Sequence, residues 1–471
     1  MLLERIYDED LAHASYVIGC QEKGQAIVVD PRRDIQVYLE LARAHDMEIT
    51  AVTETHIHAD YLSGTRELAA ATGAAIYVSD EGGTDWTYGP VFDDAVRMKD
   101  GHEIVLGNIT ITAVHTPGHT PEHLSFLITD GAQASAAGFF LSGDFVFVGD
   151  VGRPDLLDEA AGGIDTRFAG ARDLFASLRD RFLTLPDYVQ VLPAHGSGSA
   201  CGKALGTISA TTVGYERAFA WWAPYLRAGD EQGFIDELLS GQPDAHAYFA
   251  RMKVQNKVGP APLPTVTLTE YSSGRLRDEL AANTTIFVDT RDSAAVHAGT
   301  VPGSLNIPRG RAASYGAWAY DPDIEHRPLV VLADDEADAA ELRDHLVRVG
   351  IDTVTGYLTS LDGLDLVAPP LLQPEELADF AYDLLLDVRN ATEYVDGHIP
   401  GAEQLSGGRV LWNLDRLPAA GTIVTYCRSG VRNAVVASAL RRAGFDVVEL
   451  DGSYAGWIAV PGNEPGIPVG V

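Results

Sequence analysis

Residues 1 to about 200 alternate short apolar runs with segments of helical periodicity. The apolar runs 16–18 and 26–30 predict two strands of a hairpin that enters a buried sheet. Segments 34–44 and 63–72 carry apolar residues at helical spacing and predict amphipathic helices. This order of elements indicates an α/β protein with helices packed on its sheets.

A longer apolar series predicts a further helix in the same region. Its members repeat at helical spacing and end before Pro186: Phe168, Ala171, Leu174, Phe175, Leu178 and Phe182. Residues 205–256 are then mainly of helical pattern and rich in aromatic side chains. Two β-rich halves that both carry helices predict an αββα sandwich.

Two proline-rich segments, 258–264 and 367–374, are typical of linkers. Between and after them lies an internal repeat of roughly 100 residues. Three pairs of segments align across it: 286–291 with 384–389, 297–303 with 396–401, and 329–332 with 423–426. We therefore predict three domains, 1–257, 263–367 and 372–471, of which the last two are copies of one α/β domain.

The charge of the chain argues against two classes of partner. Its 471 residues include 67 acidic and 34 basic side chains, which gives a net charge of −33. Such a charge repels nucleic acid and anionic membrane surfaces, so we expect neither nucleic acid nor a membrane as a partner.

The cysteines and the N-terminus bear on the compartment. Cys20, Cys201 and Cys427 are odd in number and far apart, which disfavours a disulfide framework and favours a reducing compartment. The first residues do not have the pattern of a signal peptide, and no apolar run reaches the length of about 18 residues that suggests a membrane helix. We expect a soluble, cytoplasmic protein.

Metal-binding residue types follow predicted strands at four points of the first domain. They are His56 and His58 after 49–53, His119 after 109–114, Asp144 after 139–141 and His195 after 189–192. Side chains two positions apart on an extended chain point the same way, so the first two imidazoles can face one spot. Any one of these histidines alone would be interpreted as structural, but the cluster predicts a transition-metal centre.

This arrangement resembles the metallo-β-lactamase fold, whose motif reads His-x-His-x-Asp-His, followed by Gly-His, Gly-Asp and a late histidine. The sequence departs from that motif at Tyr61, where the dinuclear hydrolases of the family have a second-site histidine. A phenol is a poor metal ligand unless it is ionised, and its ordinary pKa is near 10. The resemblance, with this departure, implies one bound metal rather than two.

The third domain contains a thiol in a tight loop. Cys427 opens this loop between an apolar run and a predicted helix over 433–443, and Arg428 and Arg432 flank the thiol. A thiol at a helix N-terminus beside two arginines lies in positive potential, which favours the thiolate and can hold an anionic sulfur species. These three residues are therefore candidate catalytic residues.

Together with the motifs at 387–389, 398–401 and 452–457, the thiol loop resembles that of rhodanese sulfurtransferases. A phosphatase loop is the alternative interpretation of a cysteine and arginine in one loop, and the surrounding motifs argue against it.

The second domain lacks this chemistry. Alignment of the repeats puts Ala333 at the position of Cys427, and Asp334 and Asp338 opposite the two arginines. The nucleophile is absent and the charge of the loop is inverted. This copy resembles the inactive rhodanese repeats, so we expect it to be catalytically silent.

The whole-chain order resembles the persulfide dioxygenase and sulfurtransferase fusions of bacterial sulfide oxidation. The resemblance implies one non-haem Fe(II) per chain, bound by His56, His119 and Asp144, with positions open for O2 and a persulfide. It implies oxidation of a low-molecular-weight thiol persulfide to sulfite, coupled to a rhodanese that forms or uses thiosulfate through a persulfide on Cys427. The expected partners are persulfide, O2, sulfite and thiosulfate, and we expect a homo-oligomer.

Five further residues near these motifs have open roles. His58 and Asp60 are expected to orient the site without binding iron. His195 is expected to orient the site or contact the substrate, although it could also bind metal. Arg153 either binds an anionic part of the substrate or forms a surface salt bridge. Cys201 either packs structurally or relays sulfur.

A zinc-dependent thioester hydrolase of the glyoxalase II type, fused to a sulfurtransferase, is the alternative function. It would use a metal-bound hydroxide and usually two zinc ions. Tyr61 and the fused rhodanese both argue against it. A non-catalytic sulfur-carrier scaffold is a third class, and Cys427 argues against that class.

Overall fold

Strands from the first 212 residues form two mixed six-stranded sheets. The first sheet has the order β1-β2-β3-β4-β5-β6, with bounds β1 (Leu2–Asp8), β2 (His13–Cys20), β3 (Gln25–Val29), β4 (Glu48–Thr53), β5 (Ala75–Ser79) and β6 (Val96–Met98). The second has the order β12-β11-β10-β9-β8-β7, with bounds β7 (Glu103–Leu106), β8 (Ile109–His115), β9 (Leu124–Asp130), β10 (Phe139–Gly143), β11 (Gln190–Pro193) and β12 (Thr211–Thr212). β2 and β3 pair as the predicted antiparallel hairpin.

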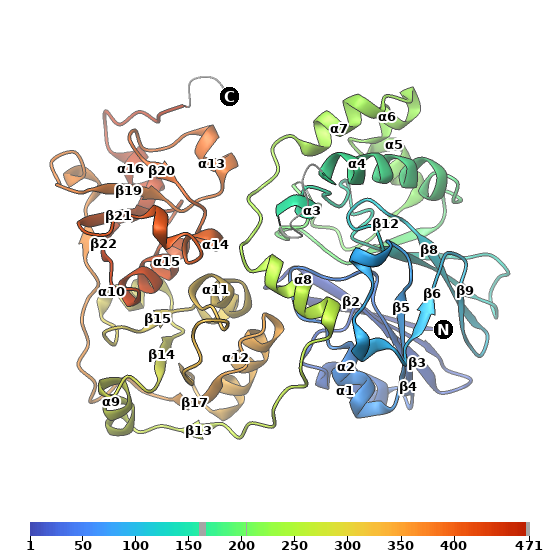
Figure 1. Cartoon of the computed structure of the whole chain (residues 1–471), viewed down its shortest axis with the longest axis horizontal. Coiled ribbons are helices and arrows are strands. Elements are labelled where there is room, and N and C mark those ends of the chain that lie inside the picture. The colour runs from blue at the N-terminus through green and yellow to red at the C-terminus, as the bar shows by residue number, and fades with distance from the viewer. Residues whose placement is uncertain (160–165, 204, 468–471) are drawn as a thin grey trace. The chain divides into compact units, whose positions relative to one another are not determined.

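The structure is a computed structural model that describes residues 1–159, 166–203 and 205–467. The chain divides into two units (Figure 1). The first unit holds Met1–Ala245 and Phe249–Leu263, and the second holds His246–Tyr248 and the chain from Pro264 onward.

The first unit contains the helices α1 to α8. Their bounds are α1 (Gln36–Ala44), α2 (Thr65–Thr72), α3 (Leu156–Glu159), α4 (Thr166–Ser177), α5 (Val213–Phe219), α6 (Ala223–Ala228), α7 (Glu231–Leu239) and α8 (Phe249–Val258). The helix predicted to run through Phe182 changes at Leu178 into a π-helical turn, Leu178–Phe182. Leu178 and Phe182 are both buried, so the apolar face of the segment continues across this change.

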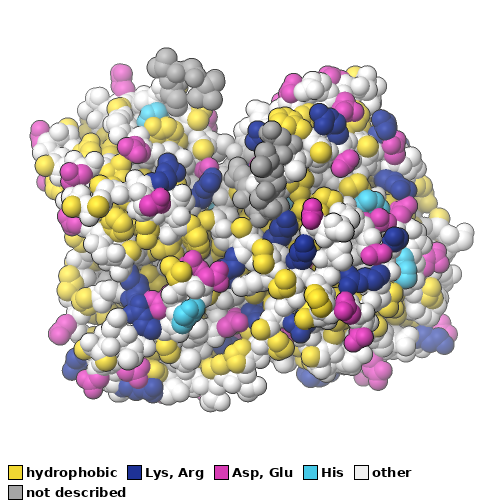
Figure 2. Space-filling view, viewed as in Figure 1, with side chains coloured by type: hydrophobic (Ala, Val, Ile, Leu, Met, Phe, Trp, Pro, Cys, Tyr) yellow, Lys and Arg dark blue, Asp and Glu magenta, His cyan; other side chains and the backbone are white. Residues whose placement is uncertain are grey.

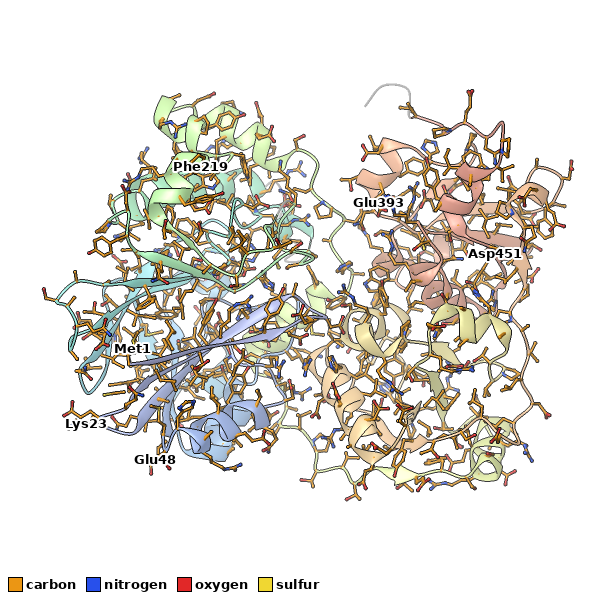
Figure 3. All side chains as sticks on the ribbon, turned by 180° about the vertical axis from the view of Figure 1, so that it is seen from behind. Met1, Lys23, Glu48, Phe219, Glu393 and Asp451 are labelled. Atoms are coloured by element: carbon orange, nitrogen blue, oxygen red, sulfur yellow. The ribbon has the colours of Figure 1, made fainter. Side chains whose placement is uncertain are left out.

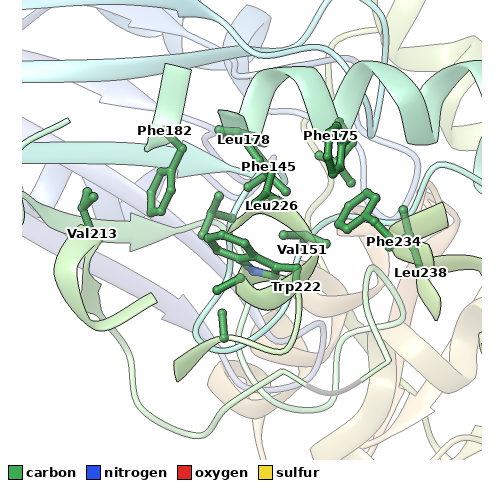
Figure 4. Close-up of a cluster of buried hydrophobic side chains, with 14 of the residues drawn as sticks. Phe145, Val151, Phe175, Leu178, Phe182, Val213, Trp222, Leu226, Phe234 and Leu238 are labelled. Atoms are coloured by element: carbon green, nitrogen blue, oxygen red, sulfur yellow. The ribbon is translucent and has the colours of Figure 1, made fainter. Parts of the chain in front are cut away.

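Three apolar layers hold the first unit together. Residues such as Ile18, Ile27 and Phe126 fill the space between the two sheets. Val28 on the other face of the first sheet packs against α1 and α2. The outer face of the second sheet packs against α4 and the helices α5 to α7, where Trp222 is fully buried (Figure 4). The predicted αββα sandwich is therefore confirmed.

The second unit contains two parallel five-stranded sheets of the same topology. One has the order β13-β17-β16-β14-β15, with bounds β13 (Thr269–Glu270), β14 (Ile286–Asp289), β15 (Leu305–Asn306), β16 (Leu329–Leu332) and β17 (Val354–Leu358). The other has the order β18-β22-β21-β19-β20, with bounds β18 (Leu371–Leu372), β19 (Leu384–Asp387), β20 (Glu403–Gln404), β21 (Thr422–Tyr426) and β22 (Asp446–Leu450). The equal strand order is what an internal repeat produces.

Helices connect these parallel strands, as parallel pairing requires. The first repeat has α9 (Ser273–Ala281), α10 (Ser293–Ala298), α11 (Ala312–Ala319) and α12 (Glu336–Arg348). The second repeat has α13 (Ala391–Asp396), α14 (Gly407–Val410), α15 (Val431–Arg442) and α16 (Ser453–Ala459).

The two repeats are bonded to each other inside the second unit. The Asn306 N–H donates to Ser438 Oγ at 2.9 Å, and His297 Nε2 lies 3.1 Å from Glu449 Oε2. Both Asn306 and Glu449 are buried. The indole of Trp318 on α11 lies directly over Gly407 on α14, where any side chain would collide with it. The repeats therefore pack as one body.

Acidic and basic side chains are interspersed over the visible face of both units (Figure 2). Within the described ranges, every helix is too short or too polar to cross a lipid bilayer.

Candidate functional site

Four strand ends of the first unit deliver the predicted metal-binding side chains. His56 follows β4, His119 follows β8, and Asp144 and His195 follow β10 and β11. β10 and β11 are parallel neighbours, with Gly143 opposite Pro193, so their carboxyl ends meet at one edge. Gly143 has a φ of 55°, and a Cβ there would lie 2.5 Å from a ring nitrogen of His123. Glycine at this position lets the chain turn and bring Asp144 into the site.

His56, His119 and Asp144 form one cluster. Their ligand atoms all lie within 4.8 Å of one another, and all three side chains are buried. Asp144 Oδ2 lies 3.5 Å from His119 Nε2 and 4.0 Å from His56 Nε2. Two imidazoles and one carboxylate at this spacing can hold a transition metal while leaving further coordination positions open.

The hydrogen bonds of this cluster leave the metal-facing atoms free. His56 Nδ1 lies 2.9 Å from Thr55 Oγ1, and His119 Nδ1 lies 3.1 Å from the Arg153 carbonyl oxygen. Each ring therefore uses Nδ1 for a neighbour and turns Nε2 toward the cluster. Neither carboxylate oxygen of Asp144 has a hydrogen-bond partner among the described residues. A buried carboxylate without a partner is costly, and a cation between these three groups would relieve that cost.

Burial sets the charge of the cluster. It lowers the pKa of His56 well below its usual value and that of His119 to about 4. It raises the pKa of Asp144 to about 6. The imidazoles are therefore neutral at neutral pH, which is the form that binds metal.

His58 is turned to a different partner. Its Nε2 lies 3.0 Å from Asp30 Oδ1. Burial lowers the pKa of His58, but the charge and hydrogen bond of Asp30 outweigh this effect and raise that pKa to about 9. His58 Nδ1 has no hydrogen-bond partner among the described residues, but this ring does not join the group of ligand atoms formed by His56, His119 and Asp144.

A second cluster lies beside the first and contains Asp60, His195 and Cys201. Their ligand atoms also lie within 4.8 Å of one another, and all three residues are buried. His195 Nε2 lies 3.4 Å from Asp60 Oδ2 and 3.4 Å from Asp144 Oδ1, so it stands between the two clusters. Burial and then the nearby Asp144 and Asp60 raise the pKa of the Cys201 thiol well above its usual value. Cys201 is therefore a neutral thiol at the edge of the site.

Tyr61 is fully buried beside these clusters. Its hydroxyl donates to the Asp30 carbonyl oxygen at 3.2 Å, and its ring centroid lies 4.6 Å from that of His58. Burial raises the pKa of Tyr61 well above its usual value, so the phenol stays neutral. A neutral phenol engaged with the backbone does not supply the ligand that a histidine would supply at this position.

Arg153 is buried and fully engaged. Its guanidinium forms a bidentate ion pair with Asp155, and Nη1 donates to the Ala200 carbonyl oxygen at 3.1 Å. Its ion pair is therefore internal rather than at the surface. Through the Ala200 contact, Arg153 holds the loop that carries Cys201, while its own carbonyl orients His119.

Several residues that support the site carry no sequence signal. Asp30 accepts hydrogen bonds from the Thr55 N–H at 2.7 Å and the Thr55 hydroxyl at 3.0 Å. Glu122 accepts from the Ile57 N–H at 2.8 Å, and burial raises the pKa of its carboxyl to about 7. Asn256 contacts the loop after His58 from a helix almost 200 residues away in sequence. Only the contacts in space identify these residues.

The thiol loop, residues 427–430, lies between β21 and α15 in the second unit. The Gly430 N–H donates to Cys427 Sγ at 3.1 Å, and the Cys427 N–H donates to Ser453 Oγ at 3.3 Å. Cys427 is buried, whereas Arg428 is exposed. Backbone N–H groups directed at the sulfur can stabilise negative charge on it or on a second sulfur bound to it.

Arg432, in the first turn of α15, is held by Glu393 on α13. The two side chains form a bidentate ion pair with N–O distances of 2.6 and 2.9 Å, and Glu393 is marked in Figure 3. Burial lowers the pKa of Arg432, but Glu393 outweighs this effect and raises it. The guanidinium is therefore a fixed positive charge next to the thiol loop.

The first repeat has an acidic loop at the corresponding position. Ala333 is buried where the second repeat has its thiol. Arg309 Nη1 lies 2.8 Å from Asp334, and Arg309 Nη2 lies 2.8 Å from Asp338. Asp335 caps α12 by accepting from the Asp338 N–H. The carboxylates of this loop are thus held in place, and they neutralise the guanidinium of Arg309.

Two family models match the chain. The metallo-beta-lactamase superfamily matches residues 8–195, and the rhodanese-like domain matches residues 373–460. A crystal structure of a metallo-beta-lactamase from Staphylococcus aureus is 36% identical, with a TM-score of 0.67, and the match covers 76% of this chain and 99% of that one.

Two curated relatives match part of the first unit. A hydroxyacylglutathione hydrolase from a Polaromonas species is 32% identical over 26% of this chain and 46% of its own length. The mitochondrial persulfide dioxygenase ETHE1 of Bos taurus is 26% identical over 33% of this chain and 56% of its own length. The chain thus spans about half the length of these curated relatives.

The metal cluster at the strand ends lies within the first family match, and the thiol loop lies within the second. The matched Staphylococcus aureus structure is covered almost from end to end. The chain therefore belongs to the metallo-beta-lactamase superfamily and carries a rhodanese-like domain in addition.

Proposed function

We propose that the chain is a non-haem Fe(II) persulfide dioxygenase coupled to a rhodanese sulfurtransferase. The observation that carries this proposal is the two-histidine, one-carboxylate cluster of His56, His119 and Asp144, with the neutral phenol of Tyr61 where a second-metal ligand would be needed. The similarity to the bovine persulfide dioxygenase supports the same activity.

The reaction proposed for the first unit is R–S–SH + O2 + H2O → R–SH + SO3²⁻ + 2 H⁺. The terminal sulfur is oxidised and O2 is reduced, so no other oxidant is required. When bound, Fe(II) would supply the electron transfer to O2 and the coordination positions for both reactants. His56, His119 and Asp144 would hold the iron, and the buried surroundings exclude bulk water.

The residues around the cluster have positioning roles in this proposal. His195 lies beside Asp144 Oδ1, whereas His56 and His119 lie beside Oδ2, and Asp60 lies beside His195. Asp60 and His195 can contact the substrate or orient the metal's ligands from there. Cys201, a neutral thiol in the same cluster, could take the outer sulfur of a persulfide R–S–SH with release of R–SH. His58 holds Asp30, which in turn holds Thr55.

The reaction proposed for the second unit is Cys–S–S⁻ + SO3²⁻ → Cys–S⁻ + S2O3²⁻. Sulfite attacks the outer sulfur, the S–S bond breaks, and Cys427 leaves as a thiolate. The Gly430 N–H is directed at that sulfur, and the fixed charge of Arg432 favours the approach of a dianion. Arg428, which is exposed, is suited to attract sulfite or thiosulfate from solution.

The proposed partners follow from these reactions. They are a low-molecular-weight persulfide, O2, sulfite and thiosulfate, with no nucleic acid and no membrane, in agreement with a net charge of −33. A homo-oligomeric state is part of the same proposal.

Metal analysis of anaerobically purified protein, together with O2 uptake on addition of a small persulfide, tests the proposed oxygenase. We expect about one iron per chain and persulfide-dependent O2 uptake. Replacement of His56, His119 or Asp144 by alanine should remove most of the iron, whereas His58→Ala should retain more of it. Two tightly bound zinc ions with thioester hydrolysis and no O2 uptake would overturn the proposal.

That second outcome corresponds to the alternative function, a zinc-dependent hydrolase of the glyoxalase II type. The similarity to the Polaromonas hydroxyacylglutathione hydrolase favours it, as does the second donor cluster of Asp60, His195 and Cys201, which could hold another metal. The neutral Tyr61 and the attached rhodanese-like domain favour the oxygenase instead.

A further inference from the structure

Asn256 on α8 contacts residues 58–63, a loop of the proposed metal site. Residues 58–63, the metal loop, carry Asp60 and Tyr61 but lie beyond the end of β4. We propose that Asn256 is a positioning residue that sets the place of Asp60 beside the metal. This inference rests on the proposed metal binding, and it makes α8, which lies outside the matched range 8–195, part of the site.

The side-chain amide of Asn256 forms three hydrogen bonds to the backbone of the metal loop. Its Nδ2 donates to the His58 carbonyl oxygen at 2.8 Å and to the Tyr61 carbonyl oxygen at 2.7 Å. Its Oδ1 accepts from the Ser63 N–H at 2.9 Å. These three bonds bracket Asp60 on both sides along the chain.

The chemistry of this position requires an amide. Two carbonyl oxygens need donors and one N–H needs an acceptor. The side-chain amide of asparagine or glutamine offers two donors and an acceptor in one group. Asn256 is 1% exposed, so water cannot replace a lost bond. An aspartate of the same shape would bring a carboxylate oxygen against two carbonyl oxygens, and each buried unsatisfied group carries a penalty.

The metal loop carries a carboxylate, that of Asp60, which His195 links to Asp144 of the cluster. Asp60 Oδ2 has no hydrogen-bond partner among the described residues and lies 3.4 Å from His195 Nε2, which also faces Asp144. His56, His119 and Asp144 themselves lie outside the loop. A shift of the loop should therefore move Asp60 while leaving the three proposed iron ligands in place.

The test compares two isosteric changes on the same helix. Asn256→Asp removes both donors to the metal loop, whereas Gln255→Glu makes the same chemical change at the neighbouring, half-exposed position and is the matched control. The readouts are the visible spectrum and stoichiometry of the Co(II)-substituted full chain, the iron content, and kcat and KM for O2 uptake with persulfide.

We expect Asn256→Asp to keep close to the control's metal content, to shift the Co(II) spectrum, and to lower kcat about tenfold, in the range of lost outer-shell contacts. Asn256→Ala, which adds no carboxylate, should show the same shift with a smaller loss, and serves if the aspartate variant does not fold. Thiosulfate:cyanide sulfurtransferase activity of the same chain should be unchanged and reports on its integrity.

Co(II) spectra and kcat equal to those of Gln255→Glu in both Asn256 variants would overturn the inference. Loss of all metal together with loss of sulfurtransferase activity would also overturn it, because the residue would then be structural only. The Co(II) spectrum does not depend on the reaction catalysed. A spectral shift in a protein that hydrolyses thioesters would therefore support the role of Asn256 and reject the dioxygenase.

Discussion

Each proposed histidine ligand is oriented by a bond on the far side of its ring. His56 is held through Thr55, whose hydroxyl lies 2.9 Å from His56 Nδ1 and 3.0 Å from Asp30 Oδ2. Asp30 has a φ of 54°, a conformation that aspartate tolerates better than most residues. Its carboxylate can thereby serve Thr55 and His58 together. The tautomer and direction of His56 thus depend on two residues that face away from the metal.

The hydroxyl of Thr55 should therefore control metal affinity. Thr55→Val keeps the shape of the side chain but removes the contact to His56 and leaves Asp30 Oδ2 unpaired. We expect Fe(II) and Co(II) affinity to fall about 10- to 100-fold, as for other outer-shell partners. Competition with a chelator measures this change.

Thr55→Ser retains the hydroxyl and should bind metal nearly as the unmodified chain does. Thr110→Val, at the far end of β8 and half-exposed, is the control for the loss of a threonine hydroxyl. Equal affinities in Thr55→Val and Thr55→Ser would refute the role of the hydroxyl.

The sequence predicts the proposed ligands but not the residues that orient them. Histidines and an aspartate directly after apolar strands are visible as a pattern, although His56 follows a strand of the first sheet and the others follow strands of the second. Asp30, Glu122 and Asn256 are single polar residues whose partners lie elsewhere in the chain. Nothing in their local sequence separates them from surface residues.

At the scale of elements, α12 and α15 occupy corresponding places in the two repeats with opposite chemistry at their first turns. α15 begins behind a thiol with Arg432 beside it, whereas α12 begins behind Ala333 with Asp334 and Asp338 beside it. A helix N-terminus favours anions, and in α12 the chain's own carboxylates already use that property.

A thiol alone should not restore sulfur transfer in the first repeat. In a Cys427→Ser background, Ala333→Cys is expected to give no thiosulfate:cyanide sulfurtransferase activity, because the adjacent carboxylates disfavour a thiolate and repel thiosulfate. The assay is release of thiocyanate.

The control is the Cys427→Ser chain itself. If the negative charge of the loop prevents sulfur transfer, adding Asp334→Arg to the double variant should increase its activity. Appreciable turnover by Ala333→Cys without that addition would contradict the electrostatic explanation.

Element boundaries follow the sequence closely where apolar periodicity is strong. The helix predicted over 433–443 begins at Val431 and ends at Arg442. The change from α4 to a π-helical turn at Leu178 leaves no trace in the spacing of apolar residues, since both forms bury the same side chains. At this point the apolar pattern of the sequence indicates which side chains are buried but does not indicate which backbone hydrogen bonds form.

At the scale of the molecule, the two proposed chemistries belong to different units of the chain. The cluster of His56, His119 and Asp144 lies in the first unit, and Cys427 lies in the second. Nothing in the proposed oxygenation requires Cys427. The order of domains is visible in the sequence because motifs and proline-rich linkers are local signals.

The ratio of sulfite to thiosulfate should report this division. With persulfide and O2, the unmodified chain is expected to accumulate thiosulfate, whereas Cys427→Ser should still consume O2 and release sulfite. Removal of iron should abolish O2 uptake and leave sulfurtransferase activity with added thiosulfate.

Ion chromatography of the two anions distinguishes these cases. Loss of O2 uptake in Cys427→Ser with iron retained would reverse the assigned direction of sulfur flow, because the rhodanese would then supply the oxygenase.

The joint between the two repeats should be sensitive to a single methyl group. A Cβ at Gly407 would lie 2.6 Å from the Trp318 ring and 3.1 Å from Val436. We expect Gly407→Ala to destabilise the second unit by about 1–3 kcal/mol through overpacking. Gly310→Ala is the control, since a Cβ there meets nothing within 4 Å.

Denaturant unfolding followed by a signal from the second unit measures the difference. Equal midpoints for the two alanine variants would mean that Trp318 can move away at little cost, and that the repeats are joined less tightly than their contacts indicate.

The bond from Asn256 to the His58 carbonyl spans 198 positions of the chain. During synthesis at about 5–20 residues per second, residue 256 appears about 10–40 s after residue 58. Once His195 has been made, the nascent chain has every strand end of the site, but the metal loop lacks its contacts with Asn256 until α8 has been made. The selection of a metal by a newly made chain is therefore expected to be completed only after α8 has left the ribosome, and a chain interrupted before that helix should bind metal with less discrimination.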